Sequence, residues 1–282
     1  MLEYAEDYGG GLIGLIRSAA PGQNVVFRGD DAAPGRVILP AGRRLGAADI
    51  GALAAMGITE PLSTGDELVP PDRVPGPGEV RDVNALLLSA LVRGCGGEPK
   101  ELGIIRDEVS ELDSALSSAA HGCDLVIVTG GSSAGAHDAV SRVIEARGRL
   151  LFHGIAMRPG KPAMLGDIGG TPVFGLPGHP GAAYFTARLL VASHIRSLLG
   201  LEAQPRTVRA KLTENLPAND GRELFCGVRL RMENGELWAE PIRTKSGLIS
   251  ALAASDGTLR VARDCEGVHR GTPVTIELED ID

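Results

Sequence analysis

An apolar strand, a glycine-rich turn and a helix start follow one another in Asp124-Leu-Val-Ile-Val-Thr-Gly-Gly-Ser-Ser-Ala-Gly-Ala-His-Asp138. Two more glycine turns follow apolar segments further along the chain, Met157-Arg-Pro-Gly-Lys-Pro162 and Gly175-Leu-Pro-Gly-His-Pro180. In a parallel sheet, turns that follow successive strands meet at the carboxyl edge, where open α/β sheets bind ligands. Glycine lets the backbone approach a ligand closely, and the free N–H groups of a helix start attract anions. The pattern predicts a protein that binds a phosphorylated or oxyanionic small molecule, and it is typical of an enzyme.

Strand-like and helix-like segments alternate around these turns, which predicts βαβ units and a mostly parallel, three-layer α/β sheet. Gly57, Gly94 and Gly148 stand where helices are expected to stop. The expected strands span residues 102–105, 124–128, 150–157 and 173–176, and the expected helices span 47–56, 82–92, 110–121, 139–146 and 181–199.

The two ends of the chain have a different pattern. Before the first helix, Asn24–Phe27 and Arg36–Leu39 are strand-like runs bracketed by turn residues. After Gly200, short strands are expected, separated by turns such as the Asn-Gly of Met232-Glu-Asn-Gly-Glu-Leu237, which is a hairpin signal. These strands span 207–212, 224–232, 236–241 and 273–278. We therefore expect a β-rich segment at 1–45, an α/β domain at 46–203 and a small β-barrel-like domain at 204–282.

Composition narrows the classes of function. The chain has 282 residues, of which 43% are hydrophobic, and a net charge of −8. This charge argues against general nucleic-acid binding, because no basic stripe is present to displace counterions from a phosphate backbone. The 4 cysteines form no Cys-x-x-Cys pair, so no zinc site is predicted and the thiols are expected to be reduced. The acidic start is unlike a secretory leader and no apolar run approaches the ~20 residues of a membrane span, so we expect a cytoplasmic protein without a membrane partner.

Four motifs each allow a structural and a functional interpretation. Gly130-Gly-Ser-Ser-Ala-Gly135 has neither dinucleotide nor Walker A spacing, so it is either a tight strand-to-helix turn or a phosphate-binding turn. Asp138 is either a helix cap or a group that orients a metal or polarises a ligand. Arg158 and Lys161 are either a solvated turn or an oxyanion clamp, with a planar fork and a point charge. Ser63-Thr-Gly-Asp-Glu67 either caps a helix or supplies carboxylates for Mg²⁺ or general-base chemistry.

With these residues in view, the chain resembles the molybdopterin molybdenumtransferases, the MoeA and gephyrin E-domain family of molybdenum cofactor biosynthesis. The C-terminal β region, with Gly221-Arg-Glu223 and Lys245-Ser-Gly247, looks like the last domain of that family, so the resemblance covers nearly the whole chain. The other matching runs stand in the family's order and are Gly29-Asp-Asp31, Ser63-Thr-Gly-Asp-Glu-Leu68, Asp82-Val-Asn84, Thr129–Asp138, Arg158-Pro-Gly-Lys-Pro162 and Leu176-Pro-Gly-His-Pro180.

The resemblance implies an enzyme that takes adenylylated molybdopterin and molybdate, hydrolyses the adenylate with the aid of Mg²⁺ and leaves molybdenum on the dithiolene. It also implies a homodimer, and an adenylyltransferase as a candidate partner protein. The residues that it implies are catalytic Glu67, Asp138 and Lys161; metal-binding Asp66, Glu67 and Asp138; and ligand-binding Ser63, Thr64, Gly65, Gly130, Gly131, Ser132, Ser133, Gly135, Arg158, Pro159, Gly160, Pro177 and Gly178.

The sequence departs from the family pattern at several positions. Arg158 stands where the family has Lys, Gly131-Ser-Ser-Ala-Gly135 where it has Gly-Val-Ser-Val-Gly, and His179 where it has Asn. Residues 1–45 are expected to be part of a family domain, whereas the N-terminal domain that precedes it in the family is expected to be missing. Only Ile58–Leu62 stands in place of the strand before the Ser-Thr-Gly run. Either this sequence omits residues of the natural protein, or the protein is a shortened relative. Two rivals follow, an adenylyltransferase of the MogA kind and a non-catalytic molybdopterin-binding protein. The basic turn together with the C-terminal β region favours the molybdenum insertase.

Overall fold

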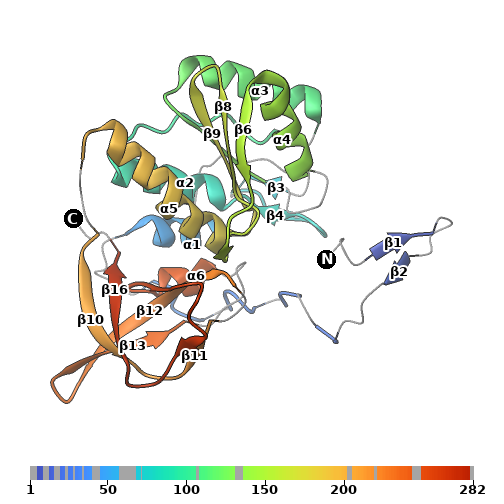
Figure 1. The fold of residues 1–282 in the computed structure, drawn as a ribbon. Helices are drawn as coiled ribbons and strands as arrows, with labels where there is room; N and C mark the ends of the chain where they lie inside the picture. The colour runs from blue at the N-terminus through green and yellow to red at the C-terminus, as the bar shows by residue number, and fades with distance from the viewer. Residues whose placement is uncertain are drawn as a thin grey trace.

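The structure is a computed structural model, drawn in Figure 1, in which an α/β unit lies beside a β-barrel. At the N-terminus, β1 (Ala5–Asp7) pairs antiparallel with β2 (Ile13–Leu15). None of the described helices combines the length and the apolarity that a membrane span requires. The structure describes residues 5–8, 13–15, 20–22, 25–27, 29–33, 35–39, 45–56, 68–70, 72–105, 108–130, 136–201, 205–218, 221–242 and 249–279, with the backbone alone at 5–7, 13, 15 and 136–138.

The α/β unit contains a mixed four-stranded sheet. Its strands stand in the order β5 (Val126–Thr129), β9 (Thr171–Leu176), β8 (Met164–Ile168) and β6 (Arg149–His153). Only β5 and β9 run parallel, whereas β8 is antiparallel to both of its neighbours. The α/β class is confirmed, but the expectation of a mostly parallel sheet is wrong for the described strands. The physical reason is that β8 and β9 are joined by the two-residue turn Gly169-Gly170, which can connect only antiparallel strands.

Helices cover both faces of this sheet and make three layers. Val173 and Phe174 are successive residues of β9, so their side chains point to opposite faces. Val173 packs with α3 (Val109–Gly122) and α4 (Ala136–Arg147). Phe174 packs with α2 (Asn84–Gly94) and α5 (Pro180–Leu198).

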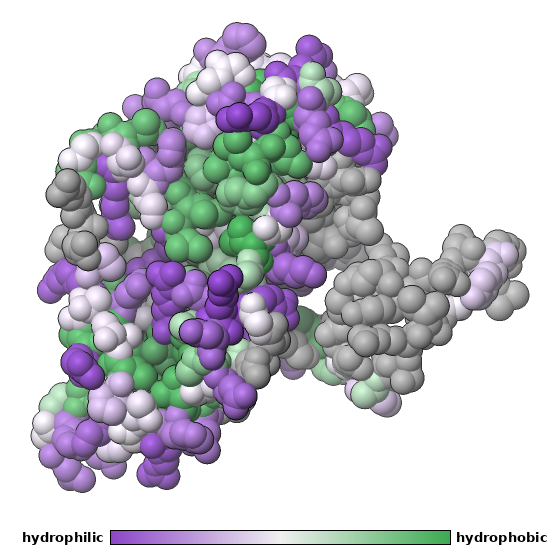
Figure 2. All heavy atoms as spheres, in the orientation of Figure 1, coloured by the Kyte–Doolittle hydropathy of each residue, from purple (hydrophilic) through white to green (hydrophobic). Residues whose placement is uncertain are grey.

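In the described part of the chain, β6 is the edge strand of this sheet. Two expected strands near it differ from the structure. Leu151 of β6 is 46% exposed, and Figure 2 shows a hydrophobic patch over this side of the α/β unit. Residues 102–105 form no extended strand in the described part of the chain. The strand expected at 150–157 is divided into β6 and β7 (Met157–Arg158), because Gly154 has a φ of 94° and its N–H donates to Ala163 O at 2.8 Å.

The C-terminal part is a five-stranded barrel, as its turn pattern predicts. The strands are β10 (Thr207–Leu212), β16 (Pro273–Leu278), β14 (Gly257–Val261), β12 (Glu223–Glu233) and β13 (Glu236–Pro241). The barrel closes because β13 pairs with both β10 and β12. The predicted hairpin joins β12 to β13 at Asn234-Gly235, and both residues have positive φ values, 51° and 79°. Short pairs accompany the two units, β11 (Leu216–Pro217) with β15 (Gly267–Val268) and β3 (Leu68–Val69) with β4 (Val80–Arg81).

The segment before α1 (Ala47–Ala55) does not form the two expected strands. In its described residues, Phe27 N–H donates to Asp30 Oδ2 at 3.0 Å and Asp30 N–H donates to Phe27 O at 3.0 Å, which closes a turn in place of a strand pair. Asp31 then reaches α6 (Ile249–Ala253), where its carboxylate accepts the Ser250 N–H at 3.0 Å. The core beside α5 also contains residues of α1 and α6, so both ends of the chain contribute to it.

Candidate functional site

The basic turn at 158–161 is held against α5. The peptide bond between Arg158 and Pro159 is cis, and Gly160 has a φ of 124°. A Cβ atom on Gly160 would lie 2.6 Å from Thr186 Oγ1, on a fully buried residue of α5. Only glycine satisfies both the positive φ and this close approach. The turn is therefore fixed in one position against the helix.

The same turn lies at the boundary between the α/β unit and the barrel, because β7 pairs with the barrel strand β12. Met157 pairs with Glu223 and Arg158 pairs with Leu224, in parallel register. The strand pairing thus connects the turn directly to β12. A movement of the barrel relative to the α/β unit would displace the two cations of the turn.

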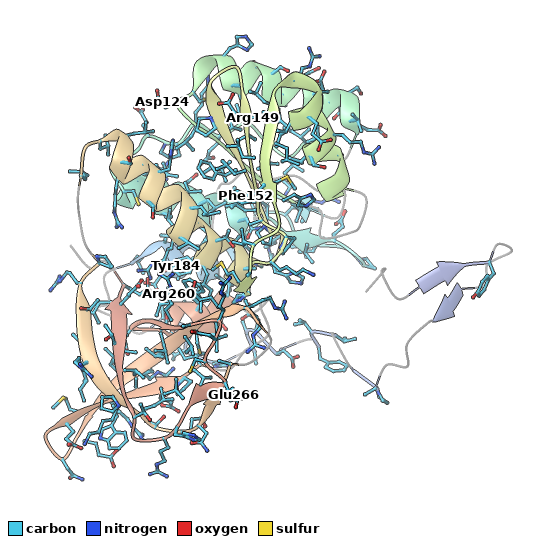
Figure 3. The ribbon with its side chains drawn as sticks, viewed as in Figure 1. Asp124, Arg149, Phe152, Tyr184, Arg260 and Glu266 are labelled. Carbon is cyan, nitrogen blue, oxygen red and sulfur yellow. The ribbon has the colours of Figure 1, made fainter. Side chains whose placement is uncertain are left out.

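Side chains reinforce this boundary. Arg260 of β14 binds the Glu223 carboxylate at 2.5 and 3.1 Å, and its guanidinium lies 5.6 Å from the ring centroid of Phe225. The hydrogen bond to Glu223 raises the pKa of Arg260, so the guanidinium stays charged. The Phe225 ring in turn lies 6.2 Å from the ring of Phe185 on α5. Figure 3 shows Arg260 and Tyr184 close to the boundary.

Three basic residues lie in or next to the paired segments. Lys161 is exposed, and its ammonium makes no hydrogen bond or ion pair with the residues that the structure describes. Arg158 is half-buried and contacts other groups. Arg222, which the sequence motifs did not single out as a site residue, immediately precedes Glu223 and is also half-buried. The signal that could have found it is its place in the Gly221-Arg-Glu223 run.

The loop at 176–180 is joined to a second motif. Asn84, the first residue of α2, donates its Nδ2 hydrogen to Gly178 O at 2.7 Å. Asp82 is buried beside it, and its carboxylate accepts the Ala85 N–H at 3.3 Å. Pro177 is buried and Gly178 half-buried. The structure therefore brings the Asp82-Val-Asn84 run into contact with the loop at 176–180, although the two are far apart in sequence. No local sequence pattern indicates this contact of Asn84.

The glycine-rich turn starts at the same edge of the sheet as this loop. Thr129 and Leu176 are partners in the parallel pairing of β5 and β9, so Gly130 and Pro177 both follow at the carboxyl ends of their strands. The predicted ligand residues Gly131, Ser132, Ser133 and Gly135 lie outside the described residues. The backbone of Asp138 lies in the first turn of α4, where a carboxylate is favoured by the helix dipole.

The predicted metal ligands are not among the described side chains. Ser63, Thr64, Gly65, Asp66 and Glu67 precede β3 and lie outside the described part of the chain. The part that is described has no group of three His, Cys, Asp or Glu side chains that could hold a metal ion. The assignment of Mg²⁺ to these carboxylates thus stays a prediction from the sequence.

Comparison with known proteins gives the family. Residues 1–57 match the sequence model "MoeA N-terminal region (domain I and II)", 60–197 match "Probable molybdopterin binding domain", and 209–278 match "MoeA C-terminal region (domain IV)". The molybdopterin molybdenumtransferase of Haemophilus influenzae is 32% identical over 281 residues, which cover 95% of this chain and 70% of that protein. The chain belongs to the MoeA family.

Other MoeA relatives agree with this assignment. Molybdopterin molybdenumtransferase 2 of Mycobacterium tuberculosis is 29% identical over 294 residues, covering 96% of this chain and 71% of that protein. The crystal structure of a molybdopterin biosynthesis MoeA protein from Pyrococcus horikosii superposes with a TM-score of 0.69 at 32% identity, covering 99% of this chain and 71% of that one. The MoeA fold is therefore confirmed, and the chain is a molybdopterin-binding protein of molybdenum cofactor biosynthesis.

The N-terminal segment also has a counterpart in the family. Residues 1–57 match the N-terminal region of MoeA, in line with the expectation that the segment before the α/β domain is part of a family domain. The chain therefore carries at least part of that region.

Proposed function

We propose that this MoeA-family chain transfers molybdenum from molybdate to molybdopterin and releases AMP from adenylylated molybdopterin. One observation carries the proposal: the basic turn at 158–161 is fixed where β7 joins the barrel. An enzyme that acts on a dianionic oxyanion needs its cations held in a constant position relative to both walls of the site. The names of the relatives from Haemophilus influenzae and Mycobacterium tuberculosis support the same reaction.

In this proposal the basic turn binds molybdate. Lys161 is exposed and without a partner among the described residues, so its ammonium is available to an incoming anion. Arg158 adds a planar guanidinium, which binds two oxygens of a tetrahedral anion at once. The attraction grows as the bound pterin excludes water, because Coulomb interactions are stronger in a less polar medium.

The carboxyl edge of the sheet binds the pterin substrate in the same proposal. Gly130 and the turn that follows it would hold the phosphate end, and the loop at 176–180 would form the neighbouring wall. Pro180 at the start of α5 has no N–H, but the N–H groups of Gly181 and Ala182 add to the attraction for anionic groups, because the N-cap His179 supplies no side-chain cap.

The acid–base groups of the proposed reaction are Glu67 and Asp138. In the hydrolysis a water molecule forms a new bond to phosphorus, the phosphoanhydride bond between molybdopterin phosphate and AMP breaks, and AMP leaves. A carboxylate near this bond would orient the water and accept its proton. Mg²⁺ held by Asp66, Glu67 and Asp138 would supply positive charge to the phosphates. A homodimer, and an adenylyltransferase that delivers the adenylylated substrate, complete the proposal.

A calorimetric titration with adenylylated molybdopterin, with and without molybdate and Mg²⁺, followed by an AMP-release assay, tests this function. Release of AMP that depends on molybdate would support the insertase. Formation of the adenylate from ATP would point instead to the adenylyltransferase rival. Tight binding without turnover would identify a non-catalytic molybdopterin-binding protein, and absence of binding would contradict the proposal.

A further inference from the structure

Asn84 links the starts of two helices. It is the first residue of α2, and its Nδ2 hydrogen is donated to the carbonyl oxygen of Gly178, two residues before α5, at 2.7 Å. The two residues are 94 positions apart in sequence, and Asn84 is only 6% exposed. The bond is therefore a buried tertiary contact between the helix start and the loop at 176–180.

The geometry of the peptide bond carries the effect of this contact into α5. A peptide unit is planar, so the Gly178 carbonyl and the His179 N–H point in opposite directions. Fixing the carbonyl with Asn84 therefore fixes the direction of the His179 N–H. Pro180 has no N–H, so the next donors of the chain are the N–H groups of Gly181 and Ala182 in the first turn of α5, where no side chain caps the helix. A loop in which these donors keep one direction is ready for an anion before the anion arrives.

Only the Nδ2 side of the Asn84 amide has a hydrogen-bond partner among the described residues. Its Oδ1 atom is buried and has no hydrogen-bond partner among the described residues, and an unsatisfied buried acceptor is destabilising. A leucine of similar size would fill the same space and remove the unpaired Oδ1 atom, but it would leave the Gly178 carbonyl without its donor. What the asparagine adds and the leucine lacks is the N–H that holds Gly178.

We infer that Asn84 is a positioning residue, which acts on the substrate through the loop at 176–180. It holds the Gly178 peptide so that Pro177, Gly178 and the start of α5 keep the conformation that binds the pterin substrate. Its effect on the reaction rests on the proposed function. Its effect on the loop does not, and can be measured in the unliganded protein.

Three variants separate positioning from packing. Asn84→Leu removes the donor and keeps the volume, and Asn84→Asp keeps the shape but replaces the donor with an acceptor. Ser89→Ala is the matched control, because Ser89 lies on the same helix, is also 6% exposed, and donates its hydroxyl hydrogen to Glu101 Oε1 at 3.0 Å, away from the loop.

The first measurement is backbone hydrogen exchange of the peptide covering 176–183 in each unliganded variant. Both Asn84 variants are expected to speed exchange there at least about fivefold, since loss of the donor leaves the Gly178 carbonyl unpaired. Ser89→Ala is expected to leave this peptide unchanged. Exchange equal to that of the wild type in both Asn84 variants would overturn the inference, whatever the activity of the protein.

The second measurement is AMP release from adenylylated molybdopterin. The KM for the adenylate is expected to rise at least about fivefold in both Asn84 variants with a smaller change in kcat, because the loop binds a part of the substrate that does not react. Equal losses in Ser89→Ala would mean that helix packing alone is responsible. A wild-type protein that releases no AMP would contradict the proposed function, while the exchange data would still decide the role of Asn84.

Discussion

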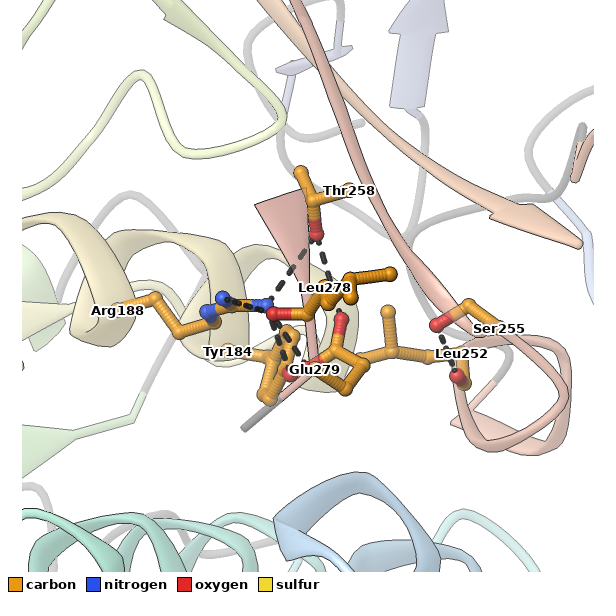
Figure 4. A network of polar contacts seen from close by, with 7 residues as sticks. All are labelled: Tyr184, Arg188, Leu252, Ser255, Thr258, Leu278 and Glu279. Carbon is orange, nitrogen blue, oxygen red and sulfur yellow. Dashed lines mark hydrogen bonds and ion pairs between the residues drawn. The ribbon is translucent and has the colours of Figure 1, made fainter. Parts of the chain in front are cut away.

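Arg188 Nη1 lies 2.8 Å from Glu279 Oε2, and this ion pair joins α5 of the α/β unit to the residue after β16 of the barrel. The two side chains are only 19% and 21% exposed. The Tyr184 hydroxyl donates to the same carboxylate, and the Thr258 hydroxyl lies 3.4 Å from its other oxygen (Figure 4). Thr258 is on β14, which pairs with β12, and β12 in turn pairs with β7. The pair thus holds the two units together on the side of α5.

Replacing Glu279 with Gln is expected to lower the free energy of unfolding by about 2 to 3 kcal/mol, because a mostly buried Arg188 would lose the charge that compensates it. Urea unfolding at pH 7 measures the loss. Glu236→Gln is the control, because Glu236 forms an ion pair with Lys211 in which both side chains are more exposed, 49% for Glu236 and 39% for Lys211. That control is expected to lose less than about 1 kcal/mol. Similar losses in the two variants would show that the contact between the units is not specially stabilising.

The buried hydroxyl of Tyr184 is expected to make the free energy of unfolding depend on pH in the alkaline range. Burial, followed by the nearby Glu279 carboxylate, raises the pKa of the Tyr184 hydroxyl well above its usual value. The folded state therefore keeps this proton at a pH where the unfolded chain releases it. Its contribution to stability is complete below the unfolded pKa of about 10 and is lost as the pH rises from there toward the folded pKa.

The comparison of wild type with Tyr184→Phe isolates this contribution. Between pH 10 and 11 the wild type is expected to lose up to about 1.4 kcal/mol per pH unit more than Tyr184→Phe, since other titrating groups are shared. Urea midpoints over pH 8 to 11 give the two slopes. Parallel curves would mean that Tyr184 titrates as an ordinary exposed tyrosine.

Much of the fold follows from local sequence signals. The strands expected at 207–212, 236–241 and 273–278 have the observed bounds of β10, β13 and β16, because turn residues delimit each of them. The helix expected at 181–199 differs by one residue at each end from α5. Antiparallel β8 was missed because the Gly169-Gly170 hairpin lies inside a stretch that was interpreted only as a connection.

The sequence predicted the motifs of the candidate site, but it did not predict how they are arranged in space. Arg158 and Lys161 were recognised from their turn, since a Pro-Gly pair with two cations is a local signal. The partner of Met157 in the barrel is Glu223, and the partner of Asn84 is Gly178. The spacing of hydrophobic residues along the chain does not indicate contacts between residues so far apart in sequence. These long-range contacts decide where the predicted cations stand.

Gly160→Ala tests whether the basic turn needs glycine. A φ of 124° and a Cβ placed 2.6 Å from Thr186 Oγ1 are expected to lower the unfolding free energy by about 2 kcal/mol or more. Gly170→Ala, with a φ of 93° and open space around it, is expected to lose only about 1 kcal/mol. Adding Thr186→Ala should recover part of the loss at Gly160 alone. Absence of that recovery would assign the effect to the backbone conformation and the nearby Met157 side chain instead of Thr186.

Lys161→Ala tests the oxyanion clamp. Loss of the ammonium is expected to raise the Kd for molybdate about tenfold, because a charge-assisted contact to the anion disappears. Lys161→Arg should retain much of the affinity, and the difference between wild type and Lys161→Ala should shrink as salt screens the charge. Lys100→Ala is the control, since Lys100 is an exposed lysine of the α/β unit outside the turn. Isothermal titration with molybdate measures all four proteins, and an unchanged Kd in Lys161→Ala would remove this residue from the binding site.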